Sequence, residues 1–198
     1  MSRNFSTNDR TLQYRRINSN FFTDTFFVIA KAKLTRGNTA MQLFVSDKGF
    51  VYVVPMKTKG EFCNALAMFA KEVWVPNALI MDPSGEQTSK KAKKLCHNIG
   101  TKQRILEEST QHANVSERYV GIAKTSIRRD MRISDCPMVF WDYCAERWAR
   151  VNNLTARALF QLQGQNPHLA CYSWRRRWYI QPLSVWMVRL GSHPRNFS

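Results

Sequence analysis

Three acidic residues stand in settings where an unpaired carboxylate is costly. Asp24 lies inside the apolar run 21–28, and Asp82 ends a short apolar stretch that breaks into a glycine turn. Glu117 opens a long amphipathic segment after a Gln-His-Ala-Asn loop. Burying an acid costs desolvation free energy unless something pairs with it, and a metal ion is one such partner. These three carboxylates are therefore candidate ligands of a shared metal site.

The chemistry that suits such a set is phosphodiester cleavage or transfer. Two divalent ions held about 3.5–4 Å apart by a few carboxylates stabilise both the attacking and the leaving oxygen. Oxygen ligands favour Mg²⁺ or Mn²⁺. We therefore expect Asp24, Asp82 and Glu117 to be both the metal ligands and the catalytic residues of a site with two Mg²⁺ or Mn²⁺ ions.

The segment that carries Glu117 also offers cations for a phosphate backbone. At about 100° per residue, four polar or small positions fall within an arc of roughly 60°: Glu117, Gly121, Lys124 and Arg128. We place the apolar face on the opposite side, at Val115, Tyr119, Ile122, Ala123 and Ser126. Lys124 and Arg128 are therefore candidate DNA contacts. The alternative is a solvated helix face with ordinary charge pairs.

The overall charge supports a polyanionic partner. The chain has 198 residues and a formal net charge of +16, which points to nucleic acid, although a merely basic, soluble surface remains an alternative. Its five cysteines are odd in number and form no CxxC pair, so neither a disulfide framework nor a zinc finger is indicated. We expect no membrane segment and no signal peptide, because no apolar run reaches about 18 residues and the N-terminus is polar.

Hydrophobic periodicity predicts how the candidate residues are positioned. Three apolar stretches predict an antiparallel meander of strands, at 21–33, 41–46 and 50–56. Two shorter strands follow at 78–81 and 103–106, and helical spacing appears at 59–74, 88–99, 114–132 and 137–153. This order predicts an α/β fold with a five-stranded mixed sheet, in which three antiparallel strands are followed by parallel additions and helices flank both faces. Asp142 and Glu146, spaced i,i+4, are expected at the surface.

Composition divides the chain into three parts. Residues 1–19 are polar and aperiodic, which predicts a flexible lead-in, and residues 20–168 form the predicted core. Residues 169–198 contain five arginines, no acid and half of the six tryptophans. This tail is either a basic aromatic nucleic-acid segment or sequence outside the fold, and we favour the second interpretation.

Several motifs, in this order and spacing, resemble the integrase catalytic core of retroelements, most closely that of copia-type retrotransposons. The similarity covers about residues 20–168 and rests on Thr23-Asp24-Thr25-Phe26, Asp82-Pro83-Ser84-Gly85-Glu86, Asn114-Val115-Ser116-Glu117-Arg118, Pro137-Met138-Val139-Phe140-Trp141 and Gly164-Gln165-Asn166-Pro167. Pro83 stands where the family usually has Asn, and no His-His-Cys-Cys zinc module precedes the core. The chain therefore resembles a core excised from a longer polyprotein.

The resemblance implies an RNase H-like fold and a D,D-E metal site in which Asp24 bridges two ions. It implies 3′-end processing and strand transfer of retrotransposon DNA, with retroelement ends and target DNA as partners. Lys124 matches a DNA-contacting lysine of the family, and Asn114, in the motif around Glu117, is a third candidate DNA contact. A homo-oligomer acting in the nucleus is also implied.

Two other hypotheses remain open from the sequence. In the first, the chain is a catalytically inactive relic or a domesticated nucleic-acid-binding module of the same fold. In the second, it is a basic packaging protein without an active site. The packaging hypothesis predicts that the three acids lie far apart.

Overall fold

The protein is built on a single five-stranded mixed sheet. The computed structural model describes residues 15–27, 36–106, 115–155, 162 and 164–172. The strands are β1 (Arg16–Phe27), β2 (Ala40–Ser46), β3 (Val51–Met56), β4 (Val75–Met81) and β5 (Lys102–Ile105), in the spatial order β3-β2-β1-β4-β5. The β1–β2 and β2–β3 pairs are antiparallel, whereas β1–β4 and β4–β5 are parallel. This topology confirms the predicted fold class.

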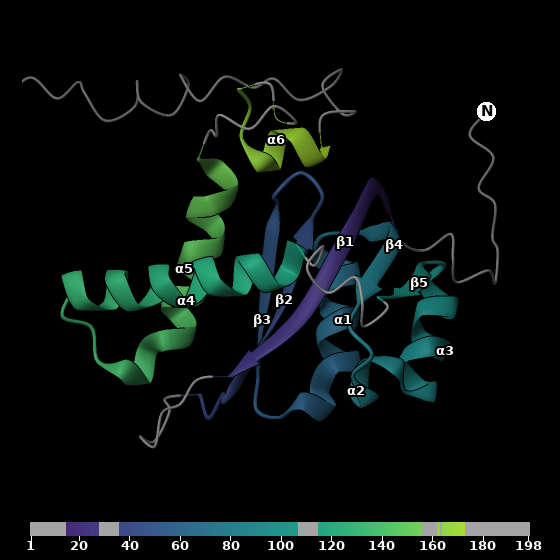
Figure 1. Cartoon of the computed structure of the whole chain (residues 1–198), viewed down its shortest axis with the longest axis horizontal. Coiled ribbons are helices and arrows are strands. Elements are labelled where there is room, and N and C mark those ends of the chain that lie inside the picture. Colours follow the sequence, from purple (N-terminus) through teal and green to yellow (C-terminus); the bar gives the residue numbers. More distant parts are fainter. Residues whose placement is uncertain (1–14, 28–35, 107–114, 156–161, 163, 173–198) are drawn as a thin grey trace, which may run out of the picture.

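Helices cover both faces of the sheet and make three layers (Figure 1). One face packs against α1 (Phe62–Glu72) and α3 (Lys90–Ile99), and the other against α4 (Val115–Ile133) and α5 (Trp141–Leu154). The short elements are η2 (Lys59–Glu61), α2 (Gly85–Thr88), η4 (Met138–Phe140) and α6 (Pro167–Tyr172). None of the helices in the described ranges is both long enough and apolar enough to cross a membrane.

Strand β2 shows how the sequence supplies two cores at once. Every one of its residues is buried. Phe44 belongs to the core beneath α1 and α3, whereas Leu43 and Val45 belong to the core beneath α4 and α5. Successive side chains of a strand point to opposite faces, so a continuous apolar run can fill both layers.

The first strand begins earlier than the sequence predicts. Residues 16–19 belong to β1 rather than to the predicted lead-in 1–19, and Ile17 is fully buried opposite Pro76 of β4. The polar residues Asn18 and Asn20 hide this extension, because they make the segment look aperiodic. The predicted continuation of the strand from 28 to 33 and the lead-in 1–14 lie outside the described residues.

The core also continues past residue 168, where we expected it to end. Helix α6 places Cys171 in the main core with 2% exposure. The Tyr172 ring lies 5.6 Å from Phe50 and 5.0 Å from Trp74. A helix of six residues is too short for its periodicity to be recognised. Residues 173–198, which hold most of the predicted tail, lie outside the described part of the chain.

Asp142 is a buried anchor rather than a surface acid. Its side chain is 2% exposed and accepts hydrogen bonds from Arg36 Nε at 2.8 Å and Asn38 Nδ2 at 2.8 Å. Glu146 accepts from Arg36 Nη1 at 3.1 Å, and both side chains of that pair are about one-third exposed. The i,i+4 spacing alone indicated a surface pair. It carries no information about Arg36, which lies 106 residues from Asp142 in the sequence.

The turn between β2 and β3 holds the start of α4 in place. Gly49 has a φ of +76°, and a Cβ there would lie 2.7 Å from Tyr119 Oη of α4. Asn152 of α5 donates from Nδ2 to the Gly49 carbonyl at 3.0 Å. A glycine is required because it alone combines this conformation with such a close approach. The turn thereby fixes the end of α4 that carries Glu117.

Candidate active site

The sheet register brings Asp24 and Asp82 to neighbouring positions. Thr23 of β1 pairs with Met81 of β4 in parallel, so the residues that follow each of them are the next pair in register. Asp24 shares its face of the sheet with Phe22 and Phe26, which pack on the core beneath α4. The strands therefore deliver two carboxylates to one place, on the side where α4 crosses.

Helix α4 presents Glu117 beside its buried stripe rather than opposite it. The buried positions are Ser116, Tyr119, Val120, Ala123, Ile127 and Met131. On an ideal helix Glu117, Lys124 and Arg128 lie roughly a quarter turn from the centre of that stripe. The expected apolar face was wrong at Ile122, which is 37% exposed. A position beside the stripe keeps Glu117 next to the sheet, whereas an opposite position would have pointed it away.

The charges of the other two acids affect the pKa of Asp24. Partial burial is the largest cause that raises its pKa, and the charges of Asp82 and Glu117 raise it further. The backbone N–H of Thr25, which donates to Asp24 Oδ1 at 2.7 Å, and the Lys124 ammonium act in the opposite direction. In the protein without a bound cation, the ionised form of Asp24 is therefore destabilised.

A buried polar network supports the backbone on either side of Asp24. Gln42 of β2 donates from Nε2 to Thr23 Oγ1 at 2.6 Å and accepts from Thr25 Oγ1 at 2.6 Å. Thr23 Oγ1 donates to the Leu43 carbonyl at 2.7 Å. Gln42 and Thr23 are fully buried, so these bonds are shielded from water. They fix the orientation of the strand from which the Asp24 carboxylate projects.

A small cavity of about 100 Å³ opens between the two strand-borne acids. Asp24, Asp82 and Glu86 line it together with Lys59 and Gln87. Gln87 is 3% exposed, and its Oε1 has no hydrogen-bond partner in the described structure. The sequence analysis missed Lys59 and Gln87 as residues near the site. Gln87 directly follows the motif that begins at Asp82, whereas nothing in the sequence links Lys59 to the acids.

The donor set is suited to a divalent cation, because three carboxylates supply hard oxygen ligands and Asp24 has unfavourable like charges nearby that a cation would relieve. Within the described ranges, however, no three His, Cys, Asp or Glu side chains are grouped closely enough to hold a metal ion as they stand. Glu117 is exposed at the start of α4. The types of these residues therefore fit a divalent cation, whereas their spacing in the described structure does not form a complete metal site.

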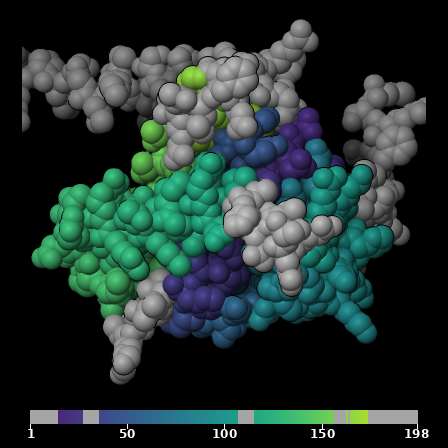
Figure 2. All heavy atoms as spheres, viewed as in Figure 1, coloured from purple at the N-terminus to yellow at the C-terminus, as the bar shows by residue number. Residues whose placement is uncertain are grey.

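The candidate DNA contacts lie on exposed surfaces near these acids. Lys124 and Arg128 are exposed on α4, and Lys124 Nζ lies 6.0 Å from the Phe26 ring centroid of β1. Figure 2 shows β1 reaching the surface beside α4. Asn114 lies outside the described residues. On α3 four lysines are exposed, at positions 90, 91, 93 and 94.

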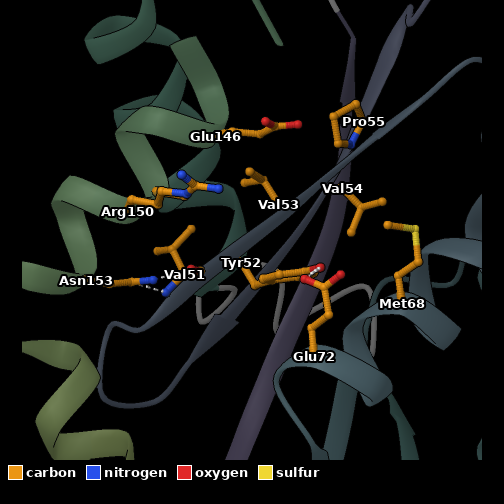
Figure 3. A pocket seen from close by; sticks show the side chains of 11 residues that line it. Val51, Tyr52, Val53, Val54, Pro55, Met68, Glu72, Glu146, Arg150 and Asn153 are labelled. Carbon is orange, nitrogen blue, oxygen red and sulfur yellow. Dashed lines mark hydrogen bonds between the residues drawn. The ribbon is translucent and has the colours of Figure 1, made fainter. Parts of the chain in front are cut away.

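Another cavity, of about 320 Å³, lies along β3, at the edge of the sheet away from the acids (Figure 3). Tyr52 Oη donates to Glu72 Oε2 at 2.6 Å across one wall of it. At its other end Asn153 of α5 accepts from Val51 N at 2.7 Å and donates to Val51 O at 2.6 Å. Neither this wall nor this end contains any of the three candidate acids.

No protein-family model matches the chain, and no curated protein sequence matches it. Solved structures do. A chain of the simian T-cell lymphotropic virus intasome, in complex with PP2A regulatory subunit B56 gamma, is similar with a TM-score of 0.64 and 16% identity. That match covers 93% of this chain and 61% of the other, so this chain spans about three fifths of its neighbour's length.

Two further matches span almost the whole length of the HTLV-2 chains concerned. The integrase catalytic core domain of HTLV-2 in complex with magnesium matches in its dimeric form with a TM-score of 0.60 and 18% identity, over 77% of this chain and 94% of that one. The trimeric form matches with a TM-score of 0.57 and 18% identity, over 78% and 96%. At these identities the similarity shows the fold alone: a mixed five-stranded sheet with flanking helices, as in these catalytic core domains.

Proposed function

We propose that this chain is the catalytic core of a DNA integrase, a polynucleotidyl transferase that processes the 3′ ends of element DNA and joins them to a target. The observation that carries the proposal is that Asp24 and Asp82 line the same small cavity, with Glu117 near enough for its charge to raise the pKa of Asp24. The shared fold with integrase cores supports it. The motifs that resemble copia-type integrases support a retrotransposon origin.

In this proposal Asp24, Asp82 and Glu117 hold two Mg²⁺ or Mn²⁺ ions. When bound, such ions supply activation of a water or 3′-hydroxyl for in-line attack and stabilisation of the leaving oxygen. The Thr25 N–H orients the Asp24 carboxylate, since it donates to Oδ1. The magnesium in the HTLV-2 core structures supports the choice of metal.

Three further residues would position DNA at this site. Lys124 and Arg128 would hold phosphates along α4, next to the acids, and Asn114 would contact DNA from the segment before Glu117. The HTLV-2 cores are dimeric and trimeric, which supports a homo-oligomer here. Genomic target DNA implies action in the nucleus. We further propose that the catalytic core extends from residue 16 to residue 172.

The decisive experiment is a strand-transfer assay with Mn²⁺, a short labelled duplex that carries the element end and a supercoiled target. We expect joined products with the wild-type protein and none with EDTA or with Asp24→Asn, which should still bind DNA. Joined products that persist in Asp24→Asn would remove Asp24 from the proposed site.

A second candidate function is a nucleic-acid-binding module of the same fold without catalysis. It is favoured by the finding that the carboxylates, in the described part of the chain, are not grouped closely enough to hold a metal. It predicts salt-dependent DNA binding and no strand transfer by the wild-type protein in any divalent metal. The packaging-protein hypothesis, by contrast, predicts that the three acids lie far apart, whereas Asp24 and Asp82 line the same small cavity.

A further inference from the structure

Strand β1 continues past Asp24 into two adjacent phenylalanines that face opposite sides of the sheet. Phe26 belongs to the core beneath α4 and α5, so Phe27, the next residue, points to the side of α1. Each ring has a lysine ammonium beside it. Lys124 Nζ of α4 lies 6.0 Å from the Phe26 ring centroid, and Lys59 Nζ of η2 lies 4.9 Å from that of Phe27. The end of β1 is therefore flanked by one cation on each face.

Lys59 approaches the candidate acids from the side of α1. It lines the small cavity of about 100 Å³ together with Asp24 and Asp82. Phe62, the first residue of α1, lines the same cavity and belongs to the core beneath α1 and α3. Lys124 lies on α4, which packs on the other face of the sheet (Figure 1). The two lysines therefore approach the acids from opposite faces.

The positive charge of Lys59 has no acidic partner in the described part of the chain. Its side chain is exposed, and the ion pairs within the described ranges all use an arginine as the cation. Lys59 is also not among the charges that shift the pKa of Asp24. An aromatic ring attracts an ammonium without neutralising its charge. Lys59 is therefore available to bind an anion beside the acids.

We propose that Lys59 binds a phosphate of the DNA strand whose reactive phosphodiester lies at the acids, on the opposite side of that phosphodiester from the phosphate bound by Lys124. The strand then crosses the end of β1 from the α4 face to the α1 face. A lysine–phosphate contact carries no base information, so Lys59 positions the strand and does not select its sequence. The inference rests on the proposed function, and it adds a DNA contact outside the motifs around the three acids.

The first test measures how DNA affinity depends on salt, by fluorescence anisotropy with a short labelled duplex in EDTA. Lys59→Met keeps the apolar stem of the side chain and removes its charge, so the slope of log affinity against log salt should fall by roughly one unit. Lys59→Arg keeps the charge and should retain the wild-type slope. Lys57→Met is the matched control, because Lys57 is exposed in the same connection but does not line the cavity. It should also retain the wild-type slope.

A second measurement locates the contact without any substitution. Acetylation of the lysines in the wild-type protein is followed by mass spectrometry, with and without a saturating amount of the duplex. DNA should slow the acetylation of Lys59 and Lys124 by roughly fivefold or more and leave that of Lys57 unchanged, because a phosphate covers only the first two. The double variant Lys59→Met/Lys124→Met should lose roughly two units of slope, since the two lysines bind separate phosphates.

A Lys59→Met slope equal to that of the wild type would overturn the proposal, as would equal protection of Lys57 and Lys59 by DNA. A double variant with the slope of either single variant would show that both lysines share one phosphate, which contradicts the strand path. Both measurements are made without a divalent metal, whereas the proposed function is judged by strand transfer in Mn²⁺. Strand transfer without a Lys59 effect would refute only the contact, and a Lys59 effect without strand transfer would refute only the catalysis.

Discussion

Replacing Asp24 by Asn should stabilise the metal-free protein while removing its response to metal. The Asp24 carboxylate is partly buried and close to the charges of Asp82 and Glu117, with Lys124 and one N–H opposing them. Two repulsions and one attraction leave about one net repulsion. A unit pair several ångströms apart at an effective dielectric constant near 20 contributes ~2 kcal/mol, and solvent exposure reduces this. We expect a gain of ~1–2 kcal/mol at pH 7.

Calorimetry or far-ultraviolet circular dichroism in EDTA measures this gain. For a chain of this size ~1 kcal/mol shifts the thermal midpoint by about 2–4 °C, so Asp24→Asn should melt roughly 2–8 °C higher than the wild type. Adding Mn²⁺ should raise the wild-type midpoint, by ~2.7 kcal/mol in stability at 100 times the dissociation constant, and should leave the variant nearly unchanged.

The pH dependence of stability gives a further check on the direction of the stability change expected for Asp24→Asn. The pKa of Asp24 is raised above 3.8 in the folded protein, so the folded state binds the proton more tightly than the unfolded state. The destabilisation is complete above the folded pKa and disappears as the pH falls through it towards 3.8. The advantage of Asp24→Asn should shrink over the same interval.

Glu86→Gln is the matched control, since Glu86 lines the same small cavity but is not among the charges that raise the pKa of Asp24. It should change neither the EDTA midpoint nor the metal response appreciably. An Asp24→Asn protein that melts below the wild type in EDTA, or that keeps the full Mn²⁺ response, would refute the electrostatic argument.

Three further outcomes are expected. Lys124→Ala should lower the slope of log affinity against log salt by roughly one unit on any DNA sequence, whereas Lys71→Ala, exposed on α1, should not; equal slopes would displace the DNA path. Asp142→Asn should cost about 2 kcal/mol in urea unfolding, because the buried charge pairing Arg36 is lost, and an unchanged midpoint would show that this anchor is dispensable. Truncation after residue 168 should lower the thermal midpoint, because Cys171 belongs to the core, whereas truncation after residue 172 should not; equal midpoints would place α6 outside the folding unit.

The sheet was predictable because its signals are local. Alternating and continuous apolar runs define β2, β3 and β4, and the glycine turn at Gly49 defines the hairpin between β2 and β3. The position of Asp82 next to Asp24 follows once β1 and β4 are parallel neighbours. Those features depend on residues adjacent in the chain, or on the strand order of a known fold.

Two of the errors arise from contacts between distant parts of the chain. Asp142 is buried because Arg36 and Asn38 reach it from the turn before β2. Ile122 is exposed because the sheet meets α4 on the side of Val120 and Ile127, which an ideal helical wheel does not specify.

The two hydrogen bonds between Asn153 and Val51 have a consequence for the behaviour of the protein at high concentration. They fix which backbone groups of β3 face away from β2, and Pro55, two pairs further along the same side, has no N–H to offer. Of the three outward positions on this edge strand, only Val53 keeps both a donor and an acceptor for a foreign strand. The outer edge of the sheet is therefore a poor template for intermolecular β-pairing, which would otherwise lead to aggregation.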